Sequence, residues 1–542
     1  MGLQKISGNI VDLFHGTVYP ATIEIENGKI AAVRKTERKE STYLLPGFVD
    51  SHIHIESSML PPSEFARLAL PHGIVATVSD PHEIGNVLGV KGIEYMIENG
   101  STVPFKFFFG APPCVPATDF ETAGARIGPE EIRHLLKKKE IKFLSEVMNF
   151  PGVIHKDPDM MAKIAIAKEL RKRIDGHAPG VRGEDLNRYI AAGIETDHEC
   201  TTLDEAREKL AKGLKILIRE GSAARDFEAL FPLMKEHPDK CMLCSDDLDP
   251  HSLSNGSINL LVKRAIAKGM DPLQALRCAS KNGIEHYGLE VGLLRVGDPA
   301  DFIEVDNLKN LNVLSTYING VCAAKHGQPQ FARIVPKIIN RFEALQRTPS
   351  DFQIRGDGHR VKAIEALDGQ LITRQIDVPL PTANGLILPD LSKDILKITV
   401  ICRYEKKAAP AVGFIKNFGL KKGAIASSIA HDSHNLIAVG TSDEMICKAV
   451  NAVIEHRGGI AVGDEGGIEC LPLPIAGLMS DKEGLWAGSQ LQKLENKAKA
   501  LGSPLASPFM TLSFMALLVI PSLKMSDKGL FDSAHFHFIY KS

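Results

Sequence analysis

Between residues 44 and 290 the chain alternates short β-rich segments with amphipathic segments of helical period. Strands that alternate with helices pair in parallel, so the pattern predicts the α/β class. Eight such strands close most simply into a (β/α)8 TIM-like barrel, and an open doubly wound sheet is the alternative. The predicted strands span Leu44–His54, Ile74–Asp80, Phe105–Gly110, Lys142–Asn149, Ile174–Ala178, Ile194–Cys200, Leu214–Glu220 and Cys241–Asp247. The predicted helices include Pro61–Leu70, Pro129–Lys138, Asp159–Lys172, Gly183–Ala192, Leu203–Lys212 and Ala223–Lys235.

The regions on either side of this repeat predict two further parts. Residues 1–43 contain a β-hairpin pattern with Glu26-Asn27-Gly28 as its turn. Leu293–Val305 returns to strand character, so we expect residues 291–340 to join residues 1–43 in a small β-sandwich that flanks the barrel at 44–290. Residues 341–542 form an additional C-terminal α/β domain in this interpretation.

Composition limits the partners and the compartment. With 64 basic and 66 acidic residues the net charge is -2, which gives no reason to expect nucleic acid or a membrane as a partner. An odd number of cysteines, nine, favours a reducing cytoplasm over a disulfide framework. The most hydrophobic stretch, Phe509–Leu523, is too short to span a membrane and is predicted to be buried core. A barrel of this size with an extra domain is expected to form a homo-oligomer.

The carboxyl ends of the predicted strands carry potential metal ligands. His52 and His54 point the same way because side chains alternate along a strand. Any one of these residues alone is better explained as structural, and a His-x-His pair also occurs on edge strands. A barrel, however, brings its carboxyl strand ends together. Four histidines and two carboxylates can hold two divalent ions, with Glu146 as a bridge. The predicted ligands are His52, His54, Glu146, His177, His198 and Asp246.

Longer motifs surround these candidate ligands. They are Pro46–Met59 (PGFVDSHIHIESSM), Ser79–Asn86 (SDPHEIGN), Leu144–Phe150 (LSEVMNF), Asp175–Gly180 (DGHAPG), Thr196–Cys200 (TDHEC), Ile218–Ala224 (IREGSAA), Cys244–Asp249 (CSDDLD) and the C-terminal run Pro508–Asp532. With them the chain resembles the amidohydrolase superfamily and, within it, the bacterial adenine deaminases. The resemblance covers nearly the whole chain. It implies conversion of adenine and water to hypoxanthine and ammonia at two divalent ions, Mn²⁺ or Fe²⁺, with Zn²⁺ as an alternative.

The resemblance also implies roles for two carboxylates. A hydroxide formed at the metals would attack C6 of adenine, and Asp246 would take its proton and pass it to the departing amine. The alternative for Asp246 is a ligand without a proton role. Many relatives carry a carboxylated lysine where this chain has Glu146, so no carbon dioxide is needed to assemble the site.

The group that protonates the purine ring is left open by the sequence. Related cytosine deaminases carry a glutamate three residues after the histidine of strand five, and here that position is Gly180. The end of strand two offers Asp80, His82 and Glu83, and we expect His82 or Glu83 to act beside the metals. The alternative is a loop braced by an Asp-Pro turn and a helix-capping carboxylate.

Two further segments are candidates for the substrate site. Arg219 and Ser222 follow strand seven and are predicted to line the base pocket, with a structural ion pair as the alternative for Arg219. The polar run from His431 to Asn435 is a candidate lid over the barrel mouth, with a turn network as the alternative.

Rival functions share the same chemistry. Deacetylation of an N-acetyl amino sugar and hydrolysis of a cyclic amide use the same hydroxide, so the metal ligands do not distinguish them from adenine deamination. A non-catalytic scaffold is a more remote alternative, because a degenerate relative would have lost ligands and this chain retains all six.

Overall fold

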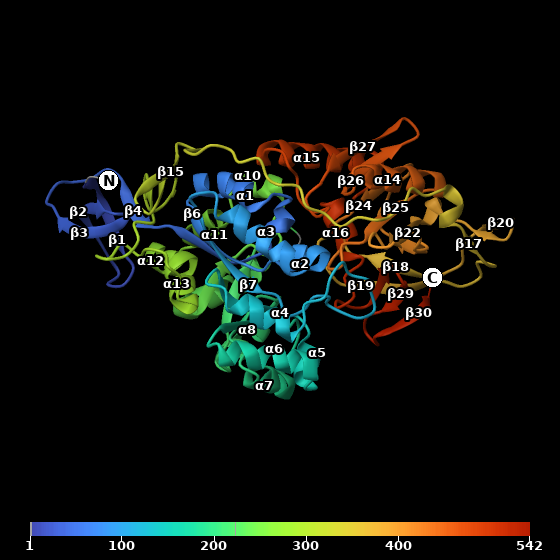
Figure 1. Cartoon of the computed structure of the whole chain (residues 1–542), viewed down its shortest axis with the longest axis horizontal. Helices are drawn as coiled ribbons and strands as arrows, with labels where there is room; N and C mark the ends of the chain where they lie inside the picture. The colour runs from blue at the N-terminus through green and yellow to red at the C-terminus, as the bar shows by residue number, and fades with distance from the viewer. Residues whose placement is uncertain (1–2, 223, 542) are drawn as a thin grey trace.

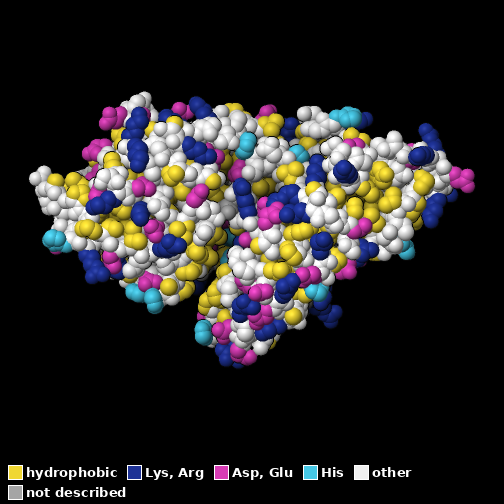
Figure 2. All heavy atoms as spheres, turned by 180° about the vertical axis from the view of Figure 1, so that it is seen from behind, with side chains coloured by type: hydrophobic (Ala, Val, Ile, Leu, Met, Phe, Trp, Pro, Cys, Tyr) yellow, Lys and Arg dark blue, Asp and Glu magenta, His cyan; other side chains and the backbone are white. Residues whose placement is uncertain are grey.

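The computed structural model describes residues 3–222 and 224–541, and it arranges the chain in three parts along its long axis (Figure 1). A β-sheet built largely from the N-terminal segment lies at one end, the helix-covered barrel lies in the middle, and the C-terminal sheet domain lies at the other end. On the face shown in Figure 2, basic and acidic side chains are interspersed. No helix among the described residues is long and apolar enough to cross a membrane.

The central part is the predicted barrel. Its strands form a five-stranded and a three-stranded parallel sheet, in the orders β5-β6-β7-β8-β9 and β10-β11-β12. Backbone contacts join these two sheets into a closed ring, with a parallel bridge between Ile53 and Asp246 on one side and a hydrogen bond from Glu195 N to Ile174 O on the other. The open sheet is therefore excluded. The strands are β5 (Phe48–Ile53), β6 (Ile74–Ser79), β7 (Lys106–Ala111), β8 (Ile141–Val147), β9 (Arg173–Gly176), β10 (Thr196–Asp197), β11 (Lys215–Arg219) and β12 (Cys241–Cys244).

Helices surround the barrel strands. Ala223, where one helix was predicted to begin, lies outside the described residues, and that helix begins at Phe227. The six helices that match predictions are α1 (Pro62–Ala69), α4 (Pro129–Leu136), α6 (Pro158–Glu169), α7 (Gly183–Ala191), α8 (Leu203–Ala211) and α9 (Phe227–Glu236). The other helices of this region fall outside the predicted segments and are α2 (His82–Leu88), α3 (Val90–Gly100), α5 (Phe150–Ile154), α10 (Pro250–Asn255), α11 (Ile258–Ala267), α12 (Pro272–Leu276) and α13 (Asn282–Tyr287).

A buried charge ties α8 to the barrel wall. The Lys209 side chain has no exposed surface and its ammonium lies 2.5 Å from Asp197 and 2.7 Å from Glu205. We expect Lys209→Met to lower the free energy of unfolding by about 3–5 kcal/mol, because it leaves a buried carboxylate without its counter-charge. Denaturant unfolding measures this loss. Lys212→Met, one turn further and partly exposed, should change it by less than about 1 kcal/mol, and an equal effect of the two would contradict the argument.

In the flanking part, strands that precede the barrel in the sequence and strands that follow it form one hydrogen-bonded sheet of eight strands. Its order is β16-β15-β14-β13-β4-β1-β2-β3, so residues after the barrel do rejoin the N-terminal residues as predicted. The predicted turn is present at Asn27-Gly28, where both residues have positive φ. The strands are β1 (Gln4–Asp12), β2 (Thr17–Glu26), β3 (Lys29–Lys35), β4 (Tyr43–Pro46), β13 (Phe302–Val305), β14 (Val313–Ile318), β15 (Val321–Lys325) and β16 (Gln328–Pro329).

The C-terminal domain is α/β, as predicted, and is built on an eight-stranded sheet in the order β19-β18-β23-β22-β25-β24-β26-β27. Its strands are β18 (Val361–Ala366), β19 (Thr373–Val378), β22 (Ile395–Ile401), β23 (Ala411–Lys416), β24 (Ala424–Ser427), β25 (Leu436–Gly440), β26 (Gly459–Asp464) and β27 (Gly467–Pro472). Two small sheets contain β17 (Ile354–Arg355), β20 (Thr382–Ala383) and β21 (Leu386–Ile387), and β28 (Leu523–Ser526), β29 (Gly529–Asp532) and β30 (His537–Lys541).

Alternation along β24 explains how this domain meets the barrel. Ala424 and Ala426 face α14 (Asp443–Glu455), whereas Ile425 points to the core that the domain shares with the barrel. On that second side lie α15 (Gly484–Ala500) and α16 (Pro508–Phe514). The hydrophobic stretch that begins at Phe509 is buried there, as predicted. The connection between β24 and β25 lies against the barrel, where His431 contacts Glu83 just after β6.

Candidate metal centre

The closing seam of the barrel brings three of the predicted ligands together. His52 lies in β5 and His54 directly follows it, so both imidazoles point to the barrel mouth and are buried. Asp246 N donates to His52 O at 2.9 Å, and His54 N donates to Asp246 O at 3.2 Å. Asp246 has a φ of 58°, which turns the chain after β12. Its Oδ1 lies 3.0 Å from His54 Nε2 and 3.4 Å from His52 Nε2.

Glu146, near the end of β8, presents its two oxygens to different histidines. Oε1 lies 3.3 Å from Nε2 of His54. Oε2 lies 2.7 Å from Nδ1 of His177 and 3.2 Å from Nε2 of His198. The rings of His52 and His198 stack with centroids 4.0 Å apart. All six predicted ligands therefore meet in one buried cluster, and the central carboxylate has the geometry of a bridge between two cations.

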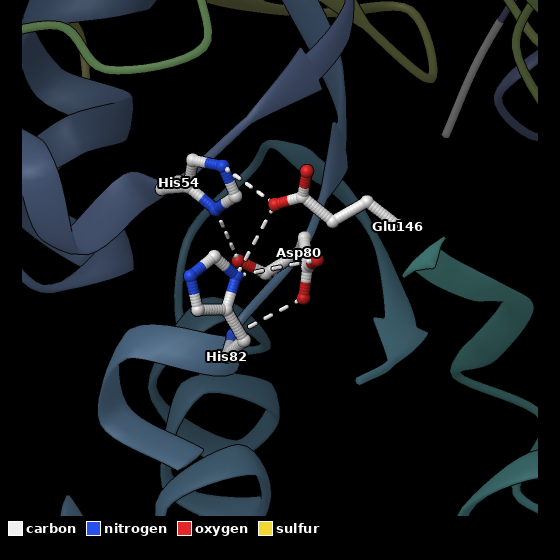
Figure 3. Close-up of side chains that lie close together, drawn as sticks. All are labelled: His54, Asp80, His82 and Glu146. Carbon is white, nitrogen blue, oxygen red and sulfur yellow. Dashed lines mark hydrogen bonds and ion pairs between the residues drawn. The ribbon is translucent and has the colours of Figure 1, made fainter. Parts of the chain in front are cut away.

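The segment after β6, where α2 begins, adds two side chains to the same cluster. Figure 3 shows His54, Asp80, His82 and Glu146 turned toward one another. His82 Nδ1 lies 3.4 Å from Glu146 Oε1 and 3.3 Å from Asp80 Oδ2. Asp80 Oδ1 also accepts a hydrogen bond from His82 N at 3.1 Å, so the braced turn that was the alternative is present as well.

The charges of the cluster explain its pKa values. Burial and the nearby His198 lower the pKa of His52 to about 4, so this imidazole is neutral at physiological pH. Burial opposes ionisation of Glu146, but His177 and His198 hold its pKa well below the usual range. Although burial opposes it, Glu146 raises the pKa of His198 to about 9. The centre therefore attracts positive charge, which divalent cations would supply.

The polar atoms of the cluster fit a metal centre. Within the described part of the chain, both ring nitrogens of His52, Nδ1 of His82 and Oδ2 of Asp80 are buried without an aligned hydrogen bond, although several of them make ion-pair contacts of 3.3–3.4 Å. Buried polar atoms are rarely left in this state, and unpaired imidazole and carboxylate atoms that converge are metal donors. Imidazole combined with carboxylate suits first-row divalent ions.

Arg219 fixes the outer oxygen of Asp246. Its Nη1 donates to Asp246 Oδ2 at 2.9 Å and also contacts Glu199, while its Nε donates to Asp226 at 3.1 Å. The ion-pair alternative is therefore realised. Ser222 bonds mainly to Asp249, whose backbone N donates to the Ser222 hydroxyl at 2.9 Å.

A cavity of about 540 Å³ opens beside this network. Arg219 and Ser222 both line it, together with Glu199. Its opposite wall comes from the C-terminal domain, from residues 368–372 and from Met510 and its neighbours at 506–514. Sequence reasoning missed this wall, although the resemblance of Pro508–Asp532 to the family marked part of it.

Glu83 contacts two histidines of the C-terminal domain. Its Oε1 lies 2.7 Å from His431 Nδ1, and its Oε2 contacts His434 Nε2. The run from His431 to Asn435 is buried, and its contact with Glu83 puts it beside the start of α2. Asp432 Oδ1 lies 3.9 Å from His82 Nε2.

Comparisons with known proteins identify the family of the chain. The model of the amidohydrolase family, which is metal-dependent, matches residues 43–322, and that of the adenine deaminase C-terminal domain matches residues 370–537. Adenine deaminase of Sulfurovum sp. (strain NBC37-1) is 57% identical over 536 residues, covering 99% of both chains. That of Salinibacter ruber (strain DSM 13855 / M31) is 52% identical over 536 residues, 99% of this chain and 98% of the relative. A solved structure, the beta-aspartyl dipeptidase of Fervidobacterium islandicum AW-1, aligns with a TM-score of 0.48 at 15% identity over 61% of this chain and 99% of that one. The chain belongs to the adenine deaminase family of the amidohydrolases.

Proposed function

We propose that this chain converts adenine and water to hypoxanthine and ammonia at a centre of two divalent cations. The observation that carries the proposal is Glu146, whose two oxygens meet different histidines at the carboxyl end of the barrel. Identity of 57% with an adenine deaminase over nearly the whole chain supports the substrate. We propose His52, His54, Glu146, His177, His198 and Asp246 as the ligands.

The residues around the centre suit a deamination. When bound, a pair of divalent cations lowers the pKa of water, so that a nucleophile is available near neutral pH. Asp246 holds one oxygen toward the histidines and the other on Arg219, so it is placed to take a proton from the attacking water and carry it to the amino group that leaves C6. Arg219 keeps this carboxylate in one orientation.

The base occupies the cavity beside Arg219 in this proposal. Nη2 of Arg219 makes one long contact with Glu199, 3.3 Å, which leaves a donor for the purine edge. Ser222 forms part of the wall. His82 lies beside the metal ligands and is the candidate donor to the ring nitrogen, and the neighbouring Glu83 carboxylate is the group that would orient it.

Three properties complete the proposal. Mn²⁺ or Fe²⁺ suits a donor set of imidazoles and carboxylates without thiolates, and Zn²⁺ is the alternative. The nine cysteines, all free thiols, suit a reducing cytoplasm. We also propose a homo-oligomer that acts on free adenine without nucleic acid or membrane as a partner, in keeping with the near-neutral charge.

An assay on the purified, Mn²⁺-loaded enzyme tests the function. We expect equal amounts of hypoxanthine and ammonia from adenine, loss of activity on chelation and its return with Mn²⁺. The same preparation is offered an N-acetyl amino sugar and a cyclic amide. Turnover of either of these without turnover of adenine would overturn the proposal.

A further inference from the structure

The connection between β24 and β25 inserts a polar, fully buried segment between the two domains. His431, Asp432 and His434 are each at most 3% exposed, although they belong to a loop. Such burial is costly for polar groups unless they are bonded. The bonds of both histidines lead to one barrel residue, Glu83, which lies 351 positions away from His434.

Both carboxylate oxygens of Glu83, which lies in the first turn of α2, contact histidines. Oε1 lies 2.7 Å from His431 Nδ1, and Oε2 contacts His434 Nε2. Its Oε1 also lies 3.6 Å from Nε2 of His82, whose Nδ1 faces Glu146. The carboxylate thus stands one imidazole away from the proposed bridging ligand.

The backbone sets the direction of one of these hydrogen bonds. Nδ1 of His434 accepts the backbone N–H of Ala430 at 3.3 Å. The neutral ring therefore carries its proton on Nε2 and donates it to Glu83. A metal ion at this nitrogen would need its lone pair, which the tautomer does not offer. The arrangement is that of donors around a carboxylate rather than a third metal site.

His431 is also fixed by its neighbours. The ring of His431 stacks on Phe514, with centroids 4.6 Å apart and planes 10° from parallel, and His431 N donates to Ser513 O at 3.1 Å. Phe514 belongs to the C-terminal wall of the cavity. One helix, α16, therefore supports both the cavity wall and the imidazole that holds Glu83.

We propose that His431 and His434 are positioning residues of the active site, supplied by the C-terminal domain, which hold Glu83 as an oriented carboxylate beside His82. The inference rests on the proposed function, in which His82, oriented by Glu83, acts on the purine ring. Its consequence is that the barrel alone contains the metal ligands but an incomplete catalytic apparatus.

Paired variants of the full-length, Mn²⁺-loaded enzyme test the proposal. His434→Leu removes the donor to Glu83, whereas His434→Gln keeps an N–H at the position of Nε2. For His431, whose donor is Nδ1, Leu removes it and Asn keeps it. We expect each Leu variant to lose about 10–100-fold in kcat with little change in KM, the usual size of effects on a supporting hydrogen bond. The Gln and Asn variants should recover most of the loss.

The controls separate this role from others. His456, at the end of α14, is exposed, so His456→Leu should leave kcat unchanged. Melting temperature and Mn²⁺ content are measured for every variant. Leu variants that keep wild-type kcat, or that lose one equivalent of Mn²⁺ in proportion to activity, would overturn the proposal, as would Gln and Asn variants no better than Leu at equal melting temperature.

Failure of this inference differs from failure of the proposed function. If Glu83→Gln retains wild-type kcat on adenine, the role assigned to Glu83 and its two histidines is wrong while the deaminase function stands. If the wild-type enzyme does not deaminate adenine at all, the proposed function itself is wrong.

Discussion

Glu146→Gln is expected to bind far less than the roughly two equivalents of Mn²⁺ that the wild-type enzyme holds, and to lose on the order of 10³-fold or more in kcat. This carboxylate lies within 3.3 Å of the three histidines that follow β5, β9 and β10. Glutamine keeps the size of the side chain but removes its charge and turns one oxygen into an N–H₂ donor. That donor would face imidazole nitrogens meant for a cation, so one ion loses a ligand and gains a repulsive neighbour.

Metal analysis paired with the adenine assay measures this effect. Glu195→Gln is the matched control, because Glu195 precedes β10 at the opposite end of the barrel and pairs with Arg173 on the surface. The control should retain its metal and its kcat, since surface ion pairs contribute about 0–1 kcal/mol. A Glu146→Gln enzyme with full metal content and wild-type kcat would remove the bridging role from the proposal.

Asp246→Asn is expected to reduce kcat by about 10²–10⁴-fold, the range attributed to a positioned acid–base group. Oδ1 of Asp246 lies 3.0 Å from His54 Nε2, and Oδ2 accepts from Arg219 at 2.9 Å. An asparagine must place its N–H₂ against either the histidines or the guanidinium, and both positions require an acceptor. The variant also cannot take up a proton from the attacking water.

The response of metal content and of kcat to excess Mn²⁺ distinguishes the two possible roles of Asp246. A ligand without a proton role predicts that excess Mn²⁺ restores both metal content and kcat. A proton carrier predicts that metal content recovers while kcat stays low. Asp239→Asn serves as the control, because its side chain is 71% exposed beside Arg277. Recovery of wild-type kcat at saturating Mn²⁺ would remove the proton role.

The barrel and the meeting of the six candidate ligands at its mouth could be predicted because both follow from local periodicity. Alternation puts His52 and His54 on one face, and the βα repeat assigns each ligand to the carboxyl end of its strand. Once the barrel is accepted, the meeting of Glu146 with His177 needs no further information. The helices α2 and α3 were not delimited because Gly89 divides a short helical region.

The contribution of the C-terminal domain could not be predicted in the same way. No pattern in the sequence indicates that His434 contacts Glu83, because that contact depends on how the two domains dock. The ion pairs of Arg219 were likewise open, because a guanidinium after β11 can reach either substrate or neighbouring carboxylates. Contacts that cross a domain boundary depend on the packing of whole surfaces, and local spacing carries no record of it.

The backbone hydrogen bonds that join the ends of β12 and β5 have a consequence for how this enzyme unfolds. Asp246 exchanges backbone hydrogen bonds with His52 and His54 through the same residues whose side chains are proposed to bind metal. Any slip of that strand pair breaks the ring and scatters the ligands in one event. Loss of the cations and opening of the barrel should therefore coincide on heating. Bound metal would then stabilise the fold as well as take part in catalysis.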